Sequence, residues 1–406
     1  MGEQQPADLA LMRELNERIV LGLLRQEGPI SRAELARRSN LSRSTISSII
    51  TTLLGAGLVR ETGIGNSQGG RRPIMIEFNY QAAFALGIEL GNTALTLLLT
   101  DLDATVLRRV ALPFTITDGP RAGIARVAAA VDDLLAEAQI AREKIVGVGV
   151  GIPGPLAHAT GRPIAPPVMP GWHDVPLQAR LEQALGMRVF VENDANLAAL
   201  AEQCWGAVQG RPNVVYLYLG SAGIGCGLIL DGRLYRGDVG SAGEIGHVMV
   251  EEDGPPCRCG SRGCLEALAG TPAVLRRAQA IGLPVATLDE LLALARGGHA
   301  KAVALLDATG EYIGIAVANI LNMINPGCVV IGGGLAAAGD LLLGSLRSTL
   351  RRRGLSVAAD NVAITLGTLG ADVVAVGAVS LVVHHALSAP SMVRPSTDFH
   401  ADVLLG

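Results

Sequence analysis

Apolar residues near the start of the chain recur at the spacing of short helices. The segment 16–26 carries them three and four positions apart and is followed by Gly28-Pro29, which predicts a helix that ends there. A second helix is predicted from Ser31, because a Ser followed three residues later by Glu34 has the spacing of a capping box. We therefore expect two consecutive helices in this region.

A third predicted helix, from Ser42 to about Leu54, has two different faces. One face carries an apolar stripe that packs inward, formed by Ile46, Ile49, Ile50 and Leu53. The opposite face carries small hydroxyl side chains with an arginine beside them: Arg43, Ser44, Ser47, Ser48 and Thr51. Small polar side chains suit a helix that lies deep in the major groove of DNA, so we expect the first four of these to contact DNA.

Two short apolar runs follow the third helix and predict a β-hairpin. They span residues 58–61 and 73–78 and flank a glycine-rich segment that ends in Arg71 and Arg72. Three helices and a hairpin predict a winged helix-turn-helix over residues 1–80. We expect Arg71 and Arg72 to reach a minor groove or phosphate. A protein-docking module of the same fold is the alternative.

The distribution of charge favours DNA as the partner of this domain. Between Arg32 and Arg72 there are seven arginines and two acidic residues. Residues 1–80 hold 10 arginines and 8 acids, so the remaining residues hold 23 basic and 29 acidic side chains. A basic head attached to an acidic body is typical of a nucleic-acid-binding protein.

The body contains two stretches with the same pattern. Residues 84–103 and 214–232 each read as an apolar strand, a turn of small residues and a second strand. Such a duplication predicts a two-lobed fold with a cleft between the lobes. Between the two stretches, the strand beginning at Val189 leads into a helix, and Asn193 and Asp194 stand at that junction. Open α/β folds place ligand-binding groups there, although the pair is equally an ordinary helix cap.

One histidine and three cysteines lie close together in a glycine-rich segment: His247, Cys257, Cys259 and Cys264. They form the Cys₃His donor set of a closed structural zinc site. The alternative, three unligated thiols, does not use the upstream histidine. Because no ligand position is left open, we expect zinc to order the loop and to take no part in chemistry. The other cysteines (Cys204, Cys226, Cys328) are scattered and are expected to be buried residues.

From about residue 13 to residue 387 the sequence resembles the ROK family of repressors and sugar kinases, specifically its regulators with an N-terminal winged helix. The most specific stretch runs from Ala242-Gly-Glu-Ile-Gly-His247 to Cys264-Leu-Glu266, and Val191-Glu-Asn-Asp-Ala-Asn196 resembles the sugar-site motif. The resemblance implies an actin-like (ribonuclease H-like) two-lobed α/β sugar-kinase fold. Its first lobe would span 81–200 with a returning helix at about 371–388, its second lobe 201–370, and a tail 389–406.

The resemblance also implies roles for individual residues. Asp194 would be the general base if the protein were a kinase. Asn193, Asp194, Glu244, His247 and Glu266 would bind the hydroxyls of a sugar effector, with His247 using its second ring nitrogen for zinc.

The first glycine turn departs from the kinase pattern Asp-x-Gly-Gly-Thr-Lys at three positions, which here are Glu89, Asn92 and Ala94. In the second turn Ala222 stands where the family has Thr. Phosphoryl transfer depends on positioning and charge neutralisation, so bound ATP and Mg²⁺ are not expected. The pattern predicts a sensor that binds sugar without phosphorylating it. An ATP-dependent sugar kinase with a DNA-binding head is the alternative, and a scaffold with a protein-docking head is a third.

Further expectations concern location and assembly. Met1 to Ala10 has no leader-peptide pattern, and no uninterrupted apolar run has the length of a membrane span, so we expect a soluble, cytoplasmic protein. A homodimer or homotetramer on a palindromic double-stranded DNA operator is expected, because one winged helix reads too few bases for useful specificity.

Overall fold

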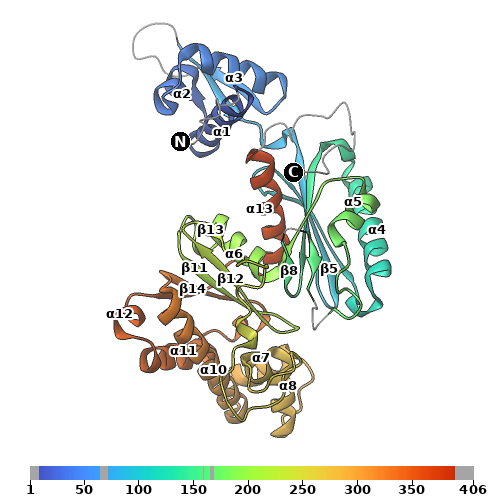
Figure 1. The fold of residues 1–406 in the computed structure, drawn as a ribbon, viewed down its shortest axis with the longest axis vertical. Coiled ribbons are helices and arrows are strands. Elements are labelled where there is room, and N and C mark those ends of the chain that lie inside the picture. The colour runs from blue at the N-terminus through green and yellow to red at the C-terminus, as the bar shows by residue number, and fades with distance from the viewer. Residues whose placement is uncertain (1–8, 65–71, 159, 165–168, 389–406) are drawn as a thin grey trace, which may run out of the picture.

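The computed structural model describes residues 9–64, 72–158, 160–164 and 169–388. These residues form a small head, two lobes built on one five-stranded sheet each, and a long C-terminal helix beside the first lobe (Figure 1).

The head has the order predicted for a winged helix. Its elements are α1 (Leu9–Glu27), β1 (Ile30–Ser31), α2 (Arg32–Ser39), α3 (Arg43–Gly55), β2 (Val59–Ile64) and β3 (Ile74–Phe78). Ile46, Ile49, Ile50 and Leu53 are buried, which confirms the inward face of α3. The wing segment from residue 65 to Arg71 lies outside the described residues.

Two details of the head differ from the sequence-based expectation. α1 begins at Leu9, about two turns earlier than the periodic segment suggested. Ser31 caps α2 through the backbone N–H of Glu34, but the carboxylate of Glu34 pairs with Arg37 and Arg38 and does not return to the cap. Only half of the capping box is therefore formed, because two nearby guanidinium groups compete for the glutamate.

The two lobes carry the same sheet twice. The first sheet has the order β6-β5-β4-β7-β10 and the second β13-β12-β11-β14-β15, with two antiparallel pairs followed by two parallel pairs in each. The first comprises β4 (Phe84–Leu90), β5 (Ala94–Asp101), β6 (Val106–Pro113), β7 (Ile145–Ile152) and β10 (Val189–Asn193). The second comprises β11 (Val214–Leu219), β12 (Ile224–Leu230), β13 (Arg233–Leu234), β14 (Cys328–Gly332) and β15 (Ala363–Leu366). The predicted duplication is thus a property of the fold.

Each sheet is covered on its outer side by its own helices. The first lobe uses α4 (Pro120–Ala138) and α5 (Leu177–Leu185), and a small hairpin, β8 (Leu156–Ala157) with β9 (Arg162–Pro163), extends from it. The second lobe uses α7 (Leu265–Ala269), α8 (Thr271–Ala280), α9 (Leu288–Arg296), α10 (Ala300–Ile324), α11 (Asp340–Arg353) and α12 (Ser356–Ala359).

Two helices exchange lobes and form the hinge region. α6 (Asp194–Cys204) leaves the first sheet and packs on β11 and β12, whereas α13 (Val373–Ser388) leaves the second sheet and packs on β4 and β7. Glycines in the sheets allow this close approach. A Cβ at Gly149 would lie 2.2 Å from the carbonyl oxygen of Ala378 on α13, and one at Gly227 would lie 2.4 Å from that of Ala195 on α6.

The head shares an apolar core with the first lobe and α13. Val20 and Leu24 of α1 belong to the same buried cluster as Leu98 of β5 and Val383 and Leu387 of α13. Arg18 of α1 also donates to the backbone carbonyl of Ser388 at the end of α13. The head is therefore packed against the body and does not hang from a free linker (Figure 1).

Two helices are long and apolar enough to cross a membrane by length and composition, although neither is an uninterrupted apolar run. They are Ala300–Ile324 and Gly370–Ser388, and 50% and 67% of their most apolar windows are buried inside the protein. Since α10 packs along α11 and α13 packs between the sheets, both have the burial of core helices.

Candidate functional site: an interlobe cleft beside a Cys₃His cluster

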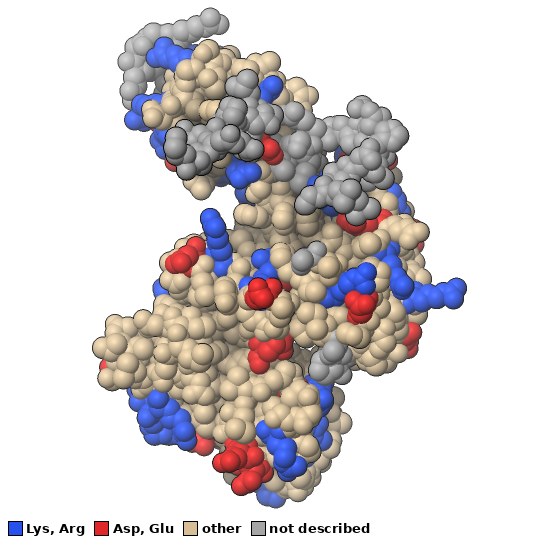
Figure 2. All heavy atoms as spheres, in the orientation of Figure 1, with Lys and Arg blue, Asp and Glu red and all other residues tan. Residues whose placement is uncertain are grey.

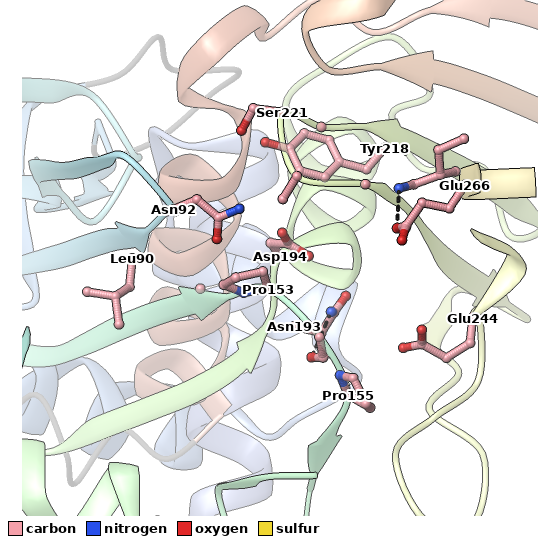
Figure 3. Close-up of a pocket in the computed structure, with 18 of the residues that line it drawn as sticks. Leu90, Asn92, Pro153, Pro155, Asn193, Asp194, Tyr218, Ser221, Glu244 and Glu266 are labelled. Atoms are coloured by element: carbon pink, nitrogen blue, oxygen red, sulfur yellow. Dashed lines mark hydrogen bonds between the residues drawn. The ribbon is translucent and has the colours of Figure 1, made fainter. Parts of the chain in front are cut away.

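A cleft opens between the two sheets at the ends of their central strands (Figure 3). It encloses about 770 Å³ of space, open solvent included. The first lobe contributes the turn after β4 and the loop after β7, and the second lobe contributes the turn after β11 and the loop that follows β13. All five residues expected to bind the effector line this one cleft: Asn193, Asp194, Glu244, His247 and Glu266.

Asn193 and Asp194 stand at the junction of β10 and α6. The Oδ1 atom of Asn193 accepts from the backbone N–H of Asn196 at 3.1 Å, and its Nδ2 donates to the carbonyl of Gly154 at 3.1 Å. Asn193 is therefore a helix cap whose side chain also lines the cleft, and its role in ligand binding stays a prediction. Burial, together with the nearby carboxyl of Glu89, raises the pKa of Asp194 to about 7.

Glu244 and Glu266 face these residues from the second lobe (Figure 3). Burial raises the pKa of Glu244. Glu266, at the start of α7, accepts from the backbone N–H of Ile224 at 3.2 Å and from Nε of Arg258 at 2.6 Å. Carboxylate and amide groups from both lobes thus point into one space, which is the arrangement needed to pair with several hydroxyl groups at once.

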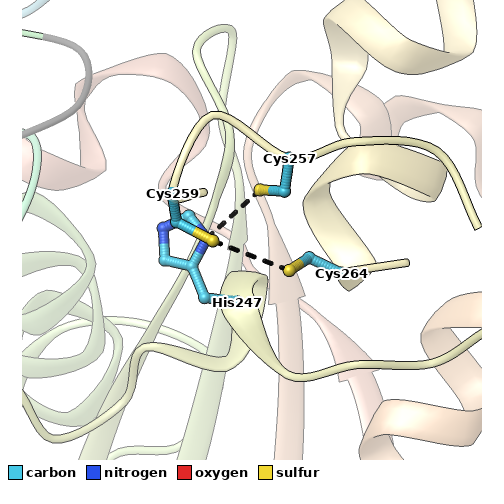
Figure 4. A group of neighbouring side chains, drawn as sticks. All are labelled: His247, Cys257, Cys259 and Cys264. Atoms are coloured by element: carbon cyan, nitrogen blue, oxygen red, sulfur yellow. Dashed lines mark hydrogen bonds between the residues drawn. The ribbon is translucent and has the colours of Figure 1, made fainter. Parts of the chain in front are cut away.

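The Cys₃His residues converge to one point (Figure 4). Their ligand atoms all lie within 4.8 Å of one another; Cys259 Sγ is 3.7 Å from Cys264 Sγ, and Cys257 Sγ is 3.6 Å from Nδ1 of His247. Tetrahedral zinc with bonds of about 2.3 Å to sulfur and about 2.0 Å to nitrogen requires ligand separations of about 3.6–3.8 Å. The residues present therefore fit zinc.

His247 connects this cluster with the cleft. Its Nδ1 atom faces the thiol of Cys257, whereas its Nε2 atom lies 4.0 Å from Oε2 of Glu244. A group held at the cluster would fix the orientation of the imidazole ring and so the side that His247 presents to the cleft.

The other end of the cleft is formed by the two glycine turns, at which the family's kinase pattern has its phosphate-binding residues, and we call it the phosphate end. Backbone amides of these turns bond within the chain: Gly91 N–H to Ala94 O and Gly220 N–H to Gly223 O close the two hairpins, and Ile224 N–H bonds to Glu266. Asn92 lines the cleft, and its Oδ1 atom is buried without a hydrogen-bond partner among the described residues. Ala94 is exposed at the start of β5.

Two cleft residues were not singled out in the sequence. Tyr218 donates from its hydroxyl to Glu89 across the cleft at 3.5 Å, and burial raises the pKa of Glu89 to about 7. Arg258, between two cysteines of the cluster, bonds to Glu266 and to the carbonyl of Ala222. The contact of Tyr218 was not recognisable beforehand, because its partner is 129 residues away in the sequence.

The DNA-contact candidates lie on the exposed face of α3. Arg43, Ser44, Ser47 and Ser48 are all exposed, as is Arg72 next to the wing, while Arg71 lies outside the described residues. Figure 2 shows basic side chains along one edge of the head. Several arginines of the head pair with acids, including Arg32 with Glu61 and Arg60 with Glu77. In the described part of the chain Arg43 has no such partner, so its charge is available to a ligand.

Comparison with known proteins agrees with these features. Residues 85–385 match the ROK family model, and residues 15–62 match that of the MarR family. The xylose repressor of Bacillus subtilis is 31% identical over 95% of this chain and 99% of its own. The glucokinase of Thermotoga maritima is 35% identical over 64% of this chain and 85% of its own. A crystal structure of a ROK family transcriptional regulator, a homologue of the Escherichia coli MLC protein, is 27% identical and superposes with a TM-score of 0.82 over 94% of this chain and 99% of that one.

These matches cover the head as well as both lobes, and they confirm the expected winged helix and the actin-like sugar-kinase fold. The chain belongs to the ROK family.

Proposed function

We propose that this protein is a sugar-responsive transcriptional repressor whose ROK body binds a sugar without phosphorylating it. It is supported above all by one observation: within a single cleft the sugar end presents carboxylates from both lobes and the amide of Asn193, while the phosphate end has Asn92 and Ala222 where the kinase pattern has Gly and Thr. The relatives named as repressors match the head and the body together, which supports the same function.

The proposal includes structural zinc held by His247, Cys257, Cys259 and Cys264. Zinc in such a site supplies four bonds that fix the loop, and leaves no open position for substrate. The loop residues would then hold His247 and Glu266 against the cleft. Sugar hydroxyls would be bound by Asn193, Asp194, Glu244, His247 and Glu266, since a polyol is recognised by paired donors and acceptors.

The partner of the head is double-stranded DNA. The exposed polar face of α3 would enter the major groove, with Arg43 at its start and Arg71 and Arg72 at the end of the wing. We propose that a homodimer or homotetramer in the cytoplasm binds a palindromic operator. A sugar that draws the two lobes together would shift the first lobe relative to the head through their common core, and so change the spacing of the paired heads.

The test is the affinity of the purified protein for duplexes from upstream of its own and neighbouring genes, measured by fluorescence anisotropy at several salt concentrations. We expect affinity to fall with salt and Arg43→Ala to lower it about 5–50-fold, with the salt slope reduced by about one. Arg126→Ala on α4 of the body is the matched control and should bind like the wild type. Absence of salt-dependent binding to any of these duplexes would refute the proposal and favour a protein-docking head.

A sugar kinase with a DNA-binding head is the second candidate, because Asp194 is in place and its raised pKa suits a general base. A coupled ADP-release assay over a panel of hexoses and pentoses separates the two. We expect no turnover above background. Turnover that Asp194→Asn abolishes would make the protein an enzyme.

A further inference from the structure

An ion pair joins the two lobes directly beneath the cleft. Glu192 lies on β10 of the first sheet and is only 3% exposed. Arg236 follows β13 of the second sheet, and its Nε atom lies 2.6 Å from Oε2 of Glu192. The side chains of Arg236 and Glu192 are 22% and 4% exposed, so the pair is well shielded from solvent.

The other oxygen of Glu192 organises the residues that line the cleft. Its Oε1 atom accepts from the backbone N–H of Asn193 at 2.9 Å and from Nδ2 of Asn196 at 3.0 Å. Both carboxylate oxygens of Glu192 are thus occupied, one by the first turn of α6 and one by the opposite lobe.

Arg236 stands in a segment that touches both lobes, which we call the bridging loop, residues 235–242. Its carbonyl accepts from the backbone N–H of Ala242 at 3.1 Å, which closes the loop. Gly240, with φ +86°, packs so tightly on β8 of the first lobe that a Cβ would lie 2.0 Å from the carbonyl oxygen of Leu156. The chain then continues directly to Glu244 and His247. The residues of the second lobe that line the cleft are therefore fixed to a loop that rests on the first lobe.

We infer that Arg236 and Glu192 are positioning residues that set the lobe separation at which Asn193 and Asp194 reach the same ligand as Glu244 and His247. The ligand part of this inference rests on the proposed function. A shielded ion pair contributes little net stability when compared with an apolar pair, but it specifies one geometry, because either charge left alone is costly. Here that geometry is the width of the cleft. The pair contacts the ligand-binding residues and not the ligand.

The first experiment needs no ligand. Hydrogen–deuterium exchange of the full chain is compared for the wild type, Arg236→Met, Arg236→Lys, the double variant Glu192→Gln/Arg236→Met and the control Arg233→Met, an exposed arginine of β13. The double variant leaves no unpaired buried charge, so its thermal stability should return toward that of the wild type. We expect faster exchange in peptides 153–158, 189–196 and 238–247 of Arg236→Met and of the double variant, with the centres of both sheets unchanged. Arg236→Lys and Arg233→Met should resemble the wild type.

The second experiment adds calorimetric titration with D-xylose, D-glucose and N-acetylglucosamine. For any of these that the wild type binds, we expect both Met-containing variants of Arg236 to lose about tenfold or more in affinity, because a small displacement of groups that act together has a large effect. Affinity for operator DNA without sugar should stay within about threefold. A double variant with wild-type exchange, or one that binds the sugar as the wild type does, overturns the inference. Failure of the wild type to bind DNA would remove the proposed function and leave the exchange result to decide the role of the pair.

Discussion

The sugar end and the phosphate end of the cleft are formed by different segments of the same two lobes, and they differ in how far they keep the residues of the family pattern. At the sugar end, carboxylates from both lobes line the cleft beside the Cys₃His cluster, and Glu192 supports the first turn of α6. At the phosphate end, the turns carry Asn92 and Ala222, and Tyr218 bonds to Glu89 across the cleft. The sugar end keeps the residues that the family resemblance assigns to sugar binding, whereas the phosphate end departs from the kinase pattern.

The difference teaches how a kinase fold can sense a sugar. Transfer of a phosphoryl group needs charge neutralisation and free amides at the phosphate, whereas recognition of a sugar needs neither. Phosphoryl transfer can therefore be lost while sugar recognition is kept, because the two ends of the cleft are formed by different turns. The following predictions address this contrast.

Removal of zinc should have the largest effect. Chelation, or Cys259→Ser, is expected to weaken sugar binding by about 10–100-fold, because His247 and Glu266 lose their support. Affinity for DNA should change much less, since the cluster is in the second lobe and the head packs on the first. Calorimetry and anisotropy on the same samples measure both quantities, with Cys204→Ser as control, because Cys204 lies outside the cluster and is exposed, not buried as the sequence had suggested. Equal loss of both activities would indicate global unfolding instead.

The next prediction compares two asparagines, Asn193 at the sugar end of the cleft and Asn92 at its phosphate end. Asn193→Ser keeps a side chain that can cap α6 but withdraws the amide, and we expect sugar affinity to fall about tenfold or more. Asn92→Ser at the phosphate end should leave sugar affinity within about twofold, because that turn does not contact the sugar. Calorimetric titration of both variants measures the difference. Similar losses in the two would mean that the ends are not distinct.

The pH dependence of stability should reveal the buried carboxyl at the phosphate end. The pKa of Glu89 is raised from 4.5 to about 7, so the folded state prefers the protonated acid. Its stabilising contribution is complete below about pH 4.5 and is lost as pH rises through about 7. Glu89→Gln mimics the protonated acid. It should therefore match the wild type near pH 5 and exceed it at pH 8 by on the order of 1–3 kcal/mol.

Thermal unfolding in matched buffers measures this difference. The carboxyl of Glu89 also helps to raise the pKa of Asp194, so Glu89→Gln should bring that pKa down toward its ordinary value, which adds to the difference at pH 8 in the same direction. A difference in melting temperature that is the same at pH 5 and pH 8 would contradict the assignment.

The smallest change is expected from repair of the first turn. Asn92→Gly/Ala94→Lys brings back the residues that the kinase pattern has there, yet we expect no turnover, because Gly220 N–H and Ile224 N–H stay bonded and Tyr218 still reaches across the cleft. The ADP-release assay measures the outcome. Measurable phosphorylation of a sugar would show that the side chains at positions 92 and 94 alone prevent kinase activity in this protein.

Local patterns in the sequence predicted much of this architecture. The apolar stripe of α3, the repeated strand–turn–strand units and the clustered cysteines each depend on residues close together in the chain, so their spacing was informative. Their outcome in the structure is a winged helix, two equivalent sheets and a compact Cys₃His cluster. The roles assigned to the individual site residues and the domain limits stay predictions.

Contacts between distant segments were not predictable. Glu89 pairs with Tyr218, 129 residues later, and Glu192 with Arg236, 44 residues later. Nothing in the local sequence of Arg236 indicates a buried partner, because its neighbours are those of an ordinary polar loop. A contact at short range was also missed. The spacing of a capping box predicted that Glu34 would bond back to the start of α2, but its carboxylate accepts hydrogen bonds from Arg37 and Arg38 instead.

The apolar core that joins α1, the first sheet and α13 constrains which substitutions these segments tolerate. The head and the last turns of α13, with Val383 and Leu387, are far apart in the sequence but share this packing. A larger or smaller side chain in either segment therefore disturbs the other. A chimera that joins this head to another ROK body should be stable only when α13 is transferred with the head. The stability of the head thus depends on residues distant from it in the sequence.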